Sequence, residues 1–321
     1  MKTALVCGAG GFLGSHLVKR LKQESYFVVG VDLKYPEFSK SLADAFFIRD
    51  LRNPIAVGHI FDKYAIDEVY QLASDLGGAA YIFSGNYDAD IMSNSALINI
   101  NVAKKASQMK VGKLFFPSST CVYPERNQTY YDCSVDIAYP AQPDNEYGWE
   151  KLFSERVYHA HKRNYGLDVR IARLHGIFGP EGVWEGGKEK APAAMCRKAA
   201  RAKDGDIIDI WGSGEQTRSY LYIDECLDGI RLLMEHEQSF EPLNIGAEET
   251  VSINQLAEMI IEISGKKIAL NHVEGPSGVQ ESHSDNRLVY KRLGWKSSQP
   301  MLKGLEQTYR WIYDQVYVKD K

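Results

Sequence analysis

The chain has 321 residues, of which 44% are hydrophobic and 25% are charged, as in an ordinary folded protein. This composition excludes disordered, collagen-like and coiled-coil classes. A net charge of −4 gives no overall attraction to nucleic acid or to an anionic membrane surface, so we expect neither as a partner.

Short apolar runs alternate with helical stretches in the first half of the chain. Runs at 4–7 and 27–31 predict buried strands on either side of a helix at 14–22. Further buried strands are expected at 68–72, 113–116 and 168–172. Strands without alternating polarity, separated by helices, are typical of a parallel sheet covered on both faces. The sequence therefore predicts an α/β fold with a Rossmann-like, doubly wound parallel sheet.

The pattern becomes irregular after Gly179. A glycine-containing stretch at 180–191 reads as a loop, and helices are expected at 253–264 and 302–317. We therefore predict a Rossmann-like domain at 1–179 and a smaller α/β region at 180–321 that binds mainly the substrate. Some segments of this second region are expected to return to the main sheet.

The five cysteines form no CxxC pair, which predicts reduced thiols. They are Cys7, Cys121, Cys133, Cys196 and Cys226. No apolar run approaches the ~20 residues that cross a bilayer, and the N-terminal residues do not form a signal peptide. We expect a cytoplasmic protein without membrane contact.

A glycine-rich turn follows the first predicted strand. Gly8, Gly11 and Gly14 give a GxxGxxG spacing that includes Phe12 and Leu13. The glycines permit a tight turn, the approach of a pyrophosphate and close packing of the helix, whose N-terminus stabilises phosphate charge. Asp32 comes just after the second strand, where a carboxylate accepts hydrogen bonds from ribose hydroxyls and repels a 2′-phosphate. The turn thus favours NAD over NADP, although a strand-end cap is an alternative role for the carboxylate.

More cofactor and substrate contacts are expected where later strands end. Asp50 and Leu51 follow a third strand and are predicted to meet the adenine, with an ordinary loop acid as the alternative. Leu72 closes the next strand at the carboxyl edge of the sheet, where ligands bind. Gly77 and Gly78 form a turn that is expected to pass close to a sugar.

A tyrosine and a lysine four residues apart suggest the reactive centre. Tyr147 and Lys151 share one face of a helix, and the ammonium is expected to lower the pKa of the phenol; without the glycine turn, a surface tyrosine–lysine pair is the alternative. Ser119, just after a buried strand, is placed to hydrogen-bond a reacting hydroxyl. The glycine turn, the serine and the YxxxK pair in this order resemble the extended short-chain dehydrogenase/reductase family, in its sugar-nucleotide epimerase and dehydratase branch. The resemblance implies bound NAD, with Ser119, Tyr147 and Lys151 as the oxidation apparatus.

Longer strings are similar to the GDP-mannose 3,5-epimerases within that family. The strings are SDLGG at 74–78, SSTCVYP at 118–124, RLHGIFGP at 173–180, WEGGKEKAPAA at 184–194, WGSGEQTRS at 211–219 and IDEC at 223–226. The resemblance implies transient oxidation at carbon 4 of the sugar, proton exchange at carbons 5 and 3, and re-reduction. It supplies Cys121 and Lys190 as the acid–base pair; a small buried thiol and a solvated loop lysine are the alternatives.

The resemblance also implies a nucleotide-sugar substrate, a homodimer and no metal. Arg218 suits bidentate binding of a diphosphate, with a structural ion pair as the alternative. The other residues expected to bind substrate, besides Gly77, Gly78, Ser119 and Lys190, are His175, Glu189, Lys198 and Gln216. For His175 the alternative is a packed residue at a strand end.

One segment departs from the family's pattern. Where the family carries two arginines, this chain has Gln280 and Ser282, and it also has Glu281. Arginines there would be expected to contact the diphosphate, so their absence leaves the identity of the nucleotide open. The alternatives are an epimerase of another nucleotide sugar such as a GDP-heptose, a 4-epimerase, a 4,6-dehydratase and an NAD(H)-binding sensor without catalysis.

Overall fold

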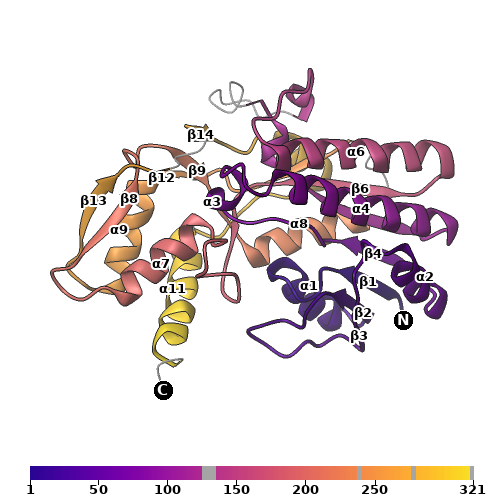
Figure 1. Cartoon of the computed structure of the whole chain (residues 1–321), viewed down its shortest axis with the longest axis horizontal. Helices are drawn as coiled ribbons and strands as arrows, with labels where there is room; N and C mark the ends of the chain where they lie inside the picture. The colour runs from indigo at the N-terminus through magenta and orange to yellow at the C-terminus, as the bar shows by residue number, and fades with distance from the viewer. Residues whose placement is uncertain (125–134, 237–240, 276–279, 319–321) are drawn as a thin grey trace.

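A computed structural model describes residues 1–124, 135–236, 241–275 and 280–318. The predicted thiol Cys133 and residues 278–279 of the departing segment lie outside the described residues. Figure 1 shows a large sheet with its helices on one side of the molecule and a smaller group of helices and short strands on the other.

The larger part is built on a seven-stranded sheet in the order β11-β6-β5-β4-β1-β2-β3. All of its neighbouring strands pair in parallel. The strands are β1 (Thr3–Cys7), β2 (Phe27–Asp32), β3 (Ala45–Ile48), β4 (Glu68–Gln71), β5 (Lys113–Ser119), β6 (Val169–Leu174) and β11 (Leu243–Ile245). The predicted Rossmann-like, doubly wound α/β fold is confirmed. The seventh strand comes from the second half of the chain and pairs with β6.

Both faces of the sheet are buried, which explains the unbroken apolar runs. Adjacent residues of β1 enter different cores: Leu5 packs in one cluster and Val6 in the other. The helices of this part are α1 (Phe12–Gln23), α2 (Pro54–Lys63), α3 (Ala79–Ile82), α4 (Asp88–Gln108), α6 (Glu146–Tyr165) and α8 (Ile223–Glu235). Helices α4 and α6 pack against each other and run side by side in Figure 1.

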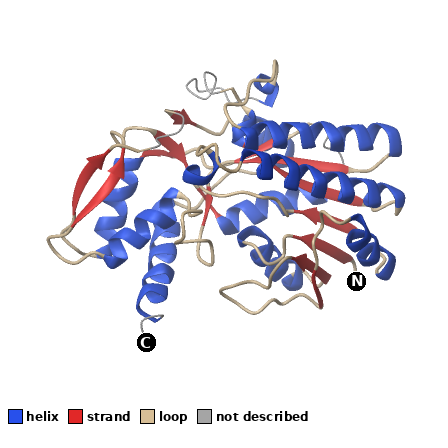
Figure 2. Cartoon of the chain, in the orientation of Figure 1, coloured by secondary structure: helices blue, strands red, loops and turns tan. Residues whose placement is uncertain are grey.

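The second part holds shorter strands, visible in red at the left of Figure 2. They form the pairs β10–β7 and β13–β8 and the three-stranded sheet β12-β9-β14. The strands are β7 (Ile177–Phe178), β8 (Ile207–Trp211), β9 (Thr217–Ser219), β10 (Leu221–Tyr222), β12 (Thr250–Ser252), β13 (Ala269–Val273) and β14 (Glu281–Ser282). The helices are α7 (Ala191–Arg201), α9 (Ile253–Ser264), α10 (Arg287–Leu293) and α11 (Met301–Val318).

Local sequence signals explain where several helices begin and end. Ser252 and Gln255 form a capping box at the start of α9, and Gly265 ends it with a φ of 67°. Asn145 caps α6 by accepting a hydrogen bond from Gly148 N at 2.8 Å. These caps satisfy backbone groups that a helix terminus leaves without partners. The cap of α6 also fixes where the helix begins, one residue before Tyr147.

Candidate active site

The turn between β1 and α1 is shaped by its glycines. Gly8 has a φ of 81°, in the left-handed region, and a Cβ there would lie 2.8 Å from Ala73 N. A Cβ on Gly14 would lie 2.0 Å from the carbonyl oxygen of Gly8, so only glycine lets α1 start this close to β1. A Cβ on Gly11 would meet nothing nearer than 3.4 Å, so its backbone stays approachable. A diphosphate suits this turn at a helix N-terminus.

Asp32 closes the same turn. One of its carboxylate oxygens accepts a hydrogen bond from Gly10 N at 2.9 Å, and the other accepts one from Leu33 N at 2.6 Å. The carboxylate therefore caps the strand end, as the alternative reading expects. Lys34 N also donates to the second oxygen, at 3.4 Å. A carboxylate has about four acceptor positions, so these bonds leave room for a ribose hydroxyl.

The remaining residues predicted to contact the cofactor differ in their surroundings. Leu51 is only 4% exposed and packs in the core below the sheet edge. The carboxylate of Asp50 is paired with Arg52 at 2.7 Å, and this bond lowers the pKa of Asp50. Three others are half-buried: Phe12, Leu13 and Leu72. Their contacts with a cofactor remain predictions.

Ser119, Tyr147 and Lys151 come together where β5 ends and α6 begins. Ser119 is the last residue of β5, and its hydroxyl is hydrogen-bonded to Tyr147. The ammonium of Lys151 lies 5.5 Å from the centroid of the Tyr147 ring and 4.8 Å from that of Phe116. The structure therefore brings these predicted residues into one cluster, with Lys151 only 2% exposed.

The pKa of Tyr147 differs from the expectation. Burial raises it above its usual range, Cys121 and Glu150 add to the rise, and the bond to Ser119 opposes it. Burial likewise lowers the pKa of Lys151, against the pull of Glu150. In the protein alone, the free-energy cost of removing a phenolate from water therefore outweighs its attraction to the nearby ammonium.

Cys121 and Lys190 lie near this cluster although they are far apart in the sequence. Cys121 belongs to the short 3₁₀ turn η1 (Thr120–Val122) directly after β5, and its N–H donates to the Ser119 hydroxyl at 3.2 Å. Lys190 is the N-cap residue of α7, and its ammonium is 3.5 Å from the carbonyl oxygen of Ile177. The thiol and the amine interact electrostatically.

The surroundings move these two pKa values toward each other. Burial raises the pKa of Cys121, while its bond to Ser119 and the charge of Lys190 oppose the rise. Burial lowers the pKa of Lys190, and Cys121 opposes that shift. Lys190 is nevertheless an exposed residue by its accessible surface, so the direction of its pKa shift reflects the protein atoms around the amine and not exclusion of solvent from it. A thiol and an amine with converging pKa values are suited to exchanging protons with the same substrate.

Three residues predicted to bind the substrate lie on the second part of the chain. Arg218 is on β9 and donates to the carbonyl oxygens of Thr217 at 2.7 Å and Gln280 at 3.3 Å. Gln216 is 7% exposed, and its amide donates to the carbonyl oxygen of Trp211 at 3.3 Å. The Lys198 ammonium bonds to the carbonyl oxygen of Asp209. Arg218 also interacts electrostatically with Cys121, so it is close to the reactive cluster.

The other predicted substrate residues have protein partners. His175 is 1% exposed, and its Nε2 lies 3.2 Å from the side-chain oxygen of Asn244, which fits the packed alternative. Glu189 forms an ion pair with Arg197 at 2.7 Å. Gly77 packs against the Tyr81 side chain, and Gly78 packs against the backbone of Glu189. Substrate contacts of all these residues remain predictions.

Sequence reasoning missed several neighbours of the thiol. The side chain of Asn145 hydrogen-bonds to Cys121; its helix-capping position was a usable signal. Ser282 on β14 lies with its hydroxyl 3.4 Å from that of Thr120, and it pairs in register with Arg218. A strand of two residues is too short to show periodicity, so nothing in the sequence predicted that Ser282 would lie close to Thr120.

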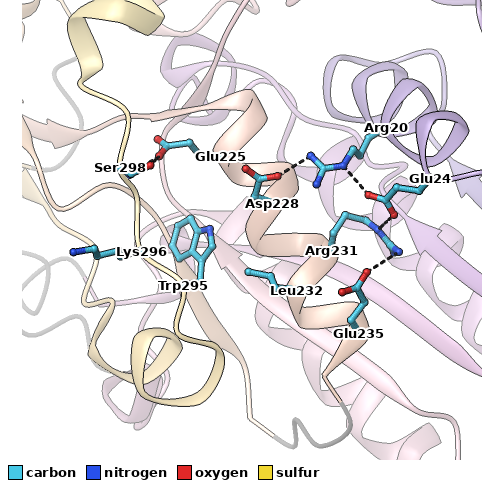
Figure 3. A pocket seen from close by; sticks show the side chains of 10 residues that line it. All are labelled: Arg20, Glu24, Glu225, Asp228, Arg231, Leu232, Glu235, Trp295, Lys296 and Ser298. Carbon is cyan, nitrogen blue, oxygen red and sulfur yellow. Dashed lines mark hydrogen bonds and ion pairs between the residues drawn. The ribbon is translucent and has the colours of Figure 1, made fainter.

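A surface pocket of about 380 Å³ lies elsewhere, between α1, α8 and residues 295–298. Figure 3 shows that its side chains are joined by ion pairs, with Arg20 and Arg231 bound to the same Glu24. None of the predicted site residues lines this pocket.

Within the described residues, no group of three or more His, Cys, Asp or Glu is arranged to hold a metal ion. None of the described helices combines the length and apolar character needed to cross a bilayer.

Known proteins resemble the chain in both sequence and structure. It is 39% identical over 316 residues to the GDP-mannose 3,5-epimerase of Arabidopsis thaliana, covering 97% of this chain and 82% of the relative. UDP-glucose 4-epimerase of Thermotoga maritima shares the fold, with a TM-score of 0.87 at 24% identity, covering 98% of this chain and 99% of the other. UDP-glucuronic acid 4-epimerase of Bacillus cereus, in complex with UDP-glucuronic acid and NAD, gives a TM-score of 0.84 at 26% identity, covering 98% of this chain and 100% of the other. Residues 4–246 match the NAD dependent epimerase/dehydratase family. The chain therefore belongs to that NAD-dependent family of epimerases and dehydratases.

Proposed function

We propose that this enzyme inverts carbons 5 and 3 of a nucleotide sugar, with GDP-mannose as the first candidate substrate. The observation that carries the proposal is that Cys121 contacts Ser119 and interacts electrostatically with both Tyr147 and Lys190. A relative that shares 39% of its residues over nearly the whole chain is named GDP-mannose 3,5-epimerase. A simple dehydrogenase centre has no need of the second acid–base pair.

The residues present fit NAD. The close approach of Gly14 to Gly8 leaves no room for a side chain at the turn, and the free acceptor capacity of Asp32 suits an unphosphorylated ribose. NAD bound there would supply a hydride acceptor and donor for carbon 4 of the sugar. The turn and Asp32 would hold the cofactor, and a sugar at the carboxyl edge of the sheet would lie beside β5.

Tyr147 acts on the sugar's 4-hydroxyl. As hydride leaves carbon 4, the proton of that hydroxyl passes to the Tyr147 oxygen, so the C–O bond becomes a ketone. Ser119 orients the hydroxyl through its bond to Tyr147, and the charge of Lys151 favours the deprotonated phenol that the step requires. On re-reduction the same proton returns to the oxygen.

Cys121 and Lys190 act on carbon-bound hydrogens. The 4-ketone acidifies the hydrogens on carbons 5 and 3, because the resulting carbanion is stabilised as an enolate. One group removes a proton from one face of the sugar and the other delivers a proton to the opposite face, which inverts the centre. Reversal of the first step then restores the 4-hydroxyl, and the whole reaction is redox-neutral.

Exchange of sugar hydrogens with deuterated solvent tests the proposal. NMR of GDP-mannose incubated with the enzyme should show deuterium entering at carbons 5 and 3. The variant Cys121→Ser should abolish this exchange while NAD stays bound. If carbon 5 exchanges undiminished in that variant, Cys121 has no part in the mechanism; if only carbon 4 changes configuration in the wild type, the enzyme is a 4-epimerase.

A thermal-shift panel of GDP-, UDP-, dTDP- and CDP-sugars tests the nucleotide. A ligand that binds the native state raises the melting temperature by an amount set by its concentration over its dissociation constant. Arg218 is the cation we propose for the diphosphate. Gln280, at the position of a family arginine, carries no positive charge, and its carbonyl oxygen accepts a hydrogen bond from Arg218. Stabilisation by a non-guanine nucleotide alone would replace GDP-mannose as the substrate.

We further propose a cytoplasmic homodimer. The described cysteines Cys7, Cys121, Cys196 and Cys226 are free thiols, which suits a reducing compartment. Large apolar side chains are exposed on the neighbouring helices α4 and α6. They are Leu97, Ile100, Trp149 and Phe153. A second copy of the chain that packs on these helices would bury them.

A further inference from the structure

The segment that carries Lys190 has no regular secondary structure of its own. Residues 184–190 run between β7 and α7, and Gly186 and Gly187 adopt φ values of 92° and 87°. Glycines lose more conformational freedom on ordering than other residues. The position of the Lys190 amine therefore depends on what holds this segment from outside.

One support is a backbone contact with the turn after β4. Gly78 N donates a hydrogen bond to the carbonyl oxygen of Lys188 at 3.0 Å. A Cβ on Gly78 would lie 2.3 Å from the carbonyl oxygen of Glu189. Any side chain at position 78 would push the backbone of 188–189 away, and Lys190 is the next residue.

A second support is a side-chain cluster. The Lys188 ammonium lies 3.8 Å from the centroid of the Tyr81 ring and 3.7 Å from a carboxylate oxygen of Asp75. Asp75 in turn accepts hydrogen bonds from the Tyr81 hydroxyl and from Asn94 on α4, both at 3.0 Å. The cluster therefore ties the 184–190 segment to a long helix of the cofactor half.

The far side of the segment is fixed to α7. Arg197 forms an ion pair with Glu189 at 2.7 Å and donates to the carbonyl oxygen of Trp184 at 2.9 Å. Together, these contacts hold the segment from both halves of the molecule. Those on the cofactor half are not explained by cofactor binding or by the packing of either core.

We propose that Asp75, Gly78, Tyr81 and Lys188 form a positioning cluster that holds Lys190 at the distance from Cys121 that proton exchange requires. The inference rests on the proposed function and deepens it. The cluster touches neither Ser119 nor Tyr147 in the described contacts, so its effect is confined to exchange at carbons 5 and 3. Displacement of a reacting group by about 1 Å costs about a hundredfold in rate.

The test compares two steps of the reaction in four variants. In Gly78→Ala, deuterium exchange at carbons 5 and 3 should fall about a hundredfold. Lys188→Met should slow exchange less, while oxidation at carbon 4, followed by absorbance of the reduced cofactor on mixing with substrate, stays at the wild-type rate. Lys188→Arg should restore exchange. Gly58→Ala, where a Cβ meets only open space, is the matched control and should change neither step.

Two results would overturn the inference. One is wild-type exchange in both Gly78→Ala and Lys188→Met. The other is a parallel fall of oxidation and exchange in Lys188→Met, which would indicate a general structural defect. Lys188 is half-exposed, so its variants should fold even if the glycine variant does not.

A second measurement needs no substrate, so it separates this inference from the proposed function. The rate at which iodoacetamide alkylates Cys121, followed by mass spectrometry against pH, reports the pKa of the thiol. The charged or titratable groups that face it are Asp144, Tyr147, Lys190 and Arg218. Lys190→Met should raise this pKa, and Gly78→Ala should raise it in the same direction. An unchanged profile in Gly78→Ala would overturn the positioning role even if the wild type exchanged no sugar hydrogen.

Discussion

At the scale of single residues, the site combines groups whose charged forms are destabilised by the surrounding protein. Tyr147, Lys151, Cys121 and Lys190 have pKa values that burial moves toward the neutral form of each group. Lys190 remains exposed to solvent, whereas Tyr147, Lys151 and Cys121 ionise more readily when a partner or a ligand compensates for the lost hydration. This dependence couples proton transfer to the presence of substrate.

Tyr147→Phe should abolish oxidation at carbon 4. The substitution removes the oxygen that takes the hydroxyl proton and keeps the ring that packs beside Lys151. Absorbance of the reduced cofactor after mixing with substrate measures the step, and the melting temperature, which should change little, is the control. An undiminished absorbance change would contradict the role of Tyr147.

His175 should make stability fall in acid. Burial lowers its pKa to about 4, with smaller effects from Asn244, Arg173 and His283. The pKa of an unfolded histidine is about 6.5, so the folded state is fully favoured above that pH. As pH falls from about 6.5 to 4, the unfolded chain binds a proton that the native histidine does not, and up to about 3 kcal/mol of unfolding free energy is lost.

Denaturant unfolding at several pH values measures this loss. His175→Asn should remove the histidine's share of the pH dependence, whereas His272→Gln, at an exposed position, should keep it. Equal pH dependence in the wild type and His175→Asn would show that other groups cause the acid sensitivity.

At the scale of secondary-structure elements, a buried ion pair joins the elements behind the site. Glu155 on α6 binds Arg173 on β6 through both of its oxygens, at 2.9 and 2.8 Å, and it accepts a hydrogen bond from Ser118 on β5 at 2.5 Å. Both charged side chains are 2% exposed. The pair joins α6 to β6, and the bond from Ser118 joins α6 to β5; together they set where Tyr147 lies relative to Ser119.

Arg173→Met should destabilise the fold strongly. Removing one partner of a buried pair leaves the other charge uncompensated, which costs about 3–5 kcal/mol. Denaturant midpoints give the change in unfolding free energy. Arg201→Met, which breaks the half-exposed pair with Glu185, is the control and should cost no more than about 1 kcal/mol. Similar losses in the two variants would contradict the structural role of the buried pair.

At the scale of the whole molecule, a charged surface pocket contrasts with an exposed apolar surface. Ion pairs satisfy the charged pocket beside α1 and α8, whereas the apolar side chains on α4 and α6 are exposed by 39–48%. Exposed apolar area grouped on neighbouring helices indicates an interface. This contrast supports the proposed dimer through α4 and α6.

Leu97→Glu or Phe153→Glu should turn a dimer into a monomer. Burial of a carboxylate without a partner is costly, so each charge opposes association through these helices. Light scattering after size-exclusion chromatography measures the mass, and Leu302→Glu on α11, 39% exposed, should leave the dimer intact. A monomeric wild type would exclude the dimer. A dimer that survives both substitutions would place the interface elsewhere.

The sequence by itself determined the central sheet and the local shape of its turns. Apolar runs such as 4–7 and 27–31 became strands buried on both faces, because periodicity and burial are local consequences of residue type. The glycines at 8 and 14 likewise specify a close approach that no other residue permits. The sequence also indicated helix α11, which extends one residue beyond the predicted helix at each end.

Only the tertiary structure decided which distant groups meet. The approach of Gly78 to Glu189, the pairing of β14 with β9 and the electrostatic contact of Cys121 with Lys190 join segments that carry no complementary pattern. Strands of two or three residues have too few positions to show periodicity, and a loop's position follows from what it packs against. The reacting residue types could therefore be read along the chain, but their distances depend on contacts that form only when both halves have folded.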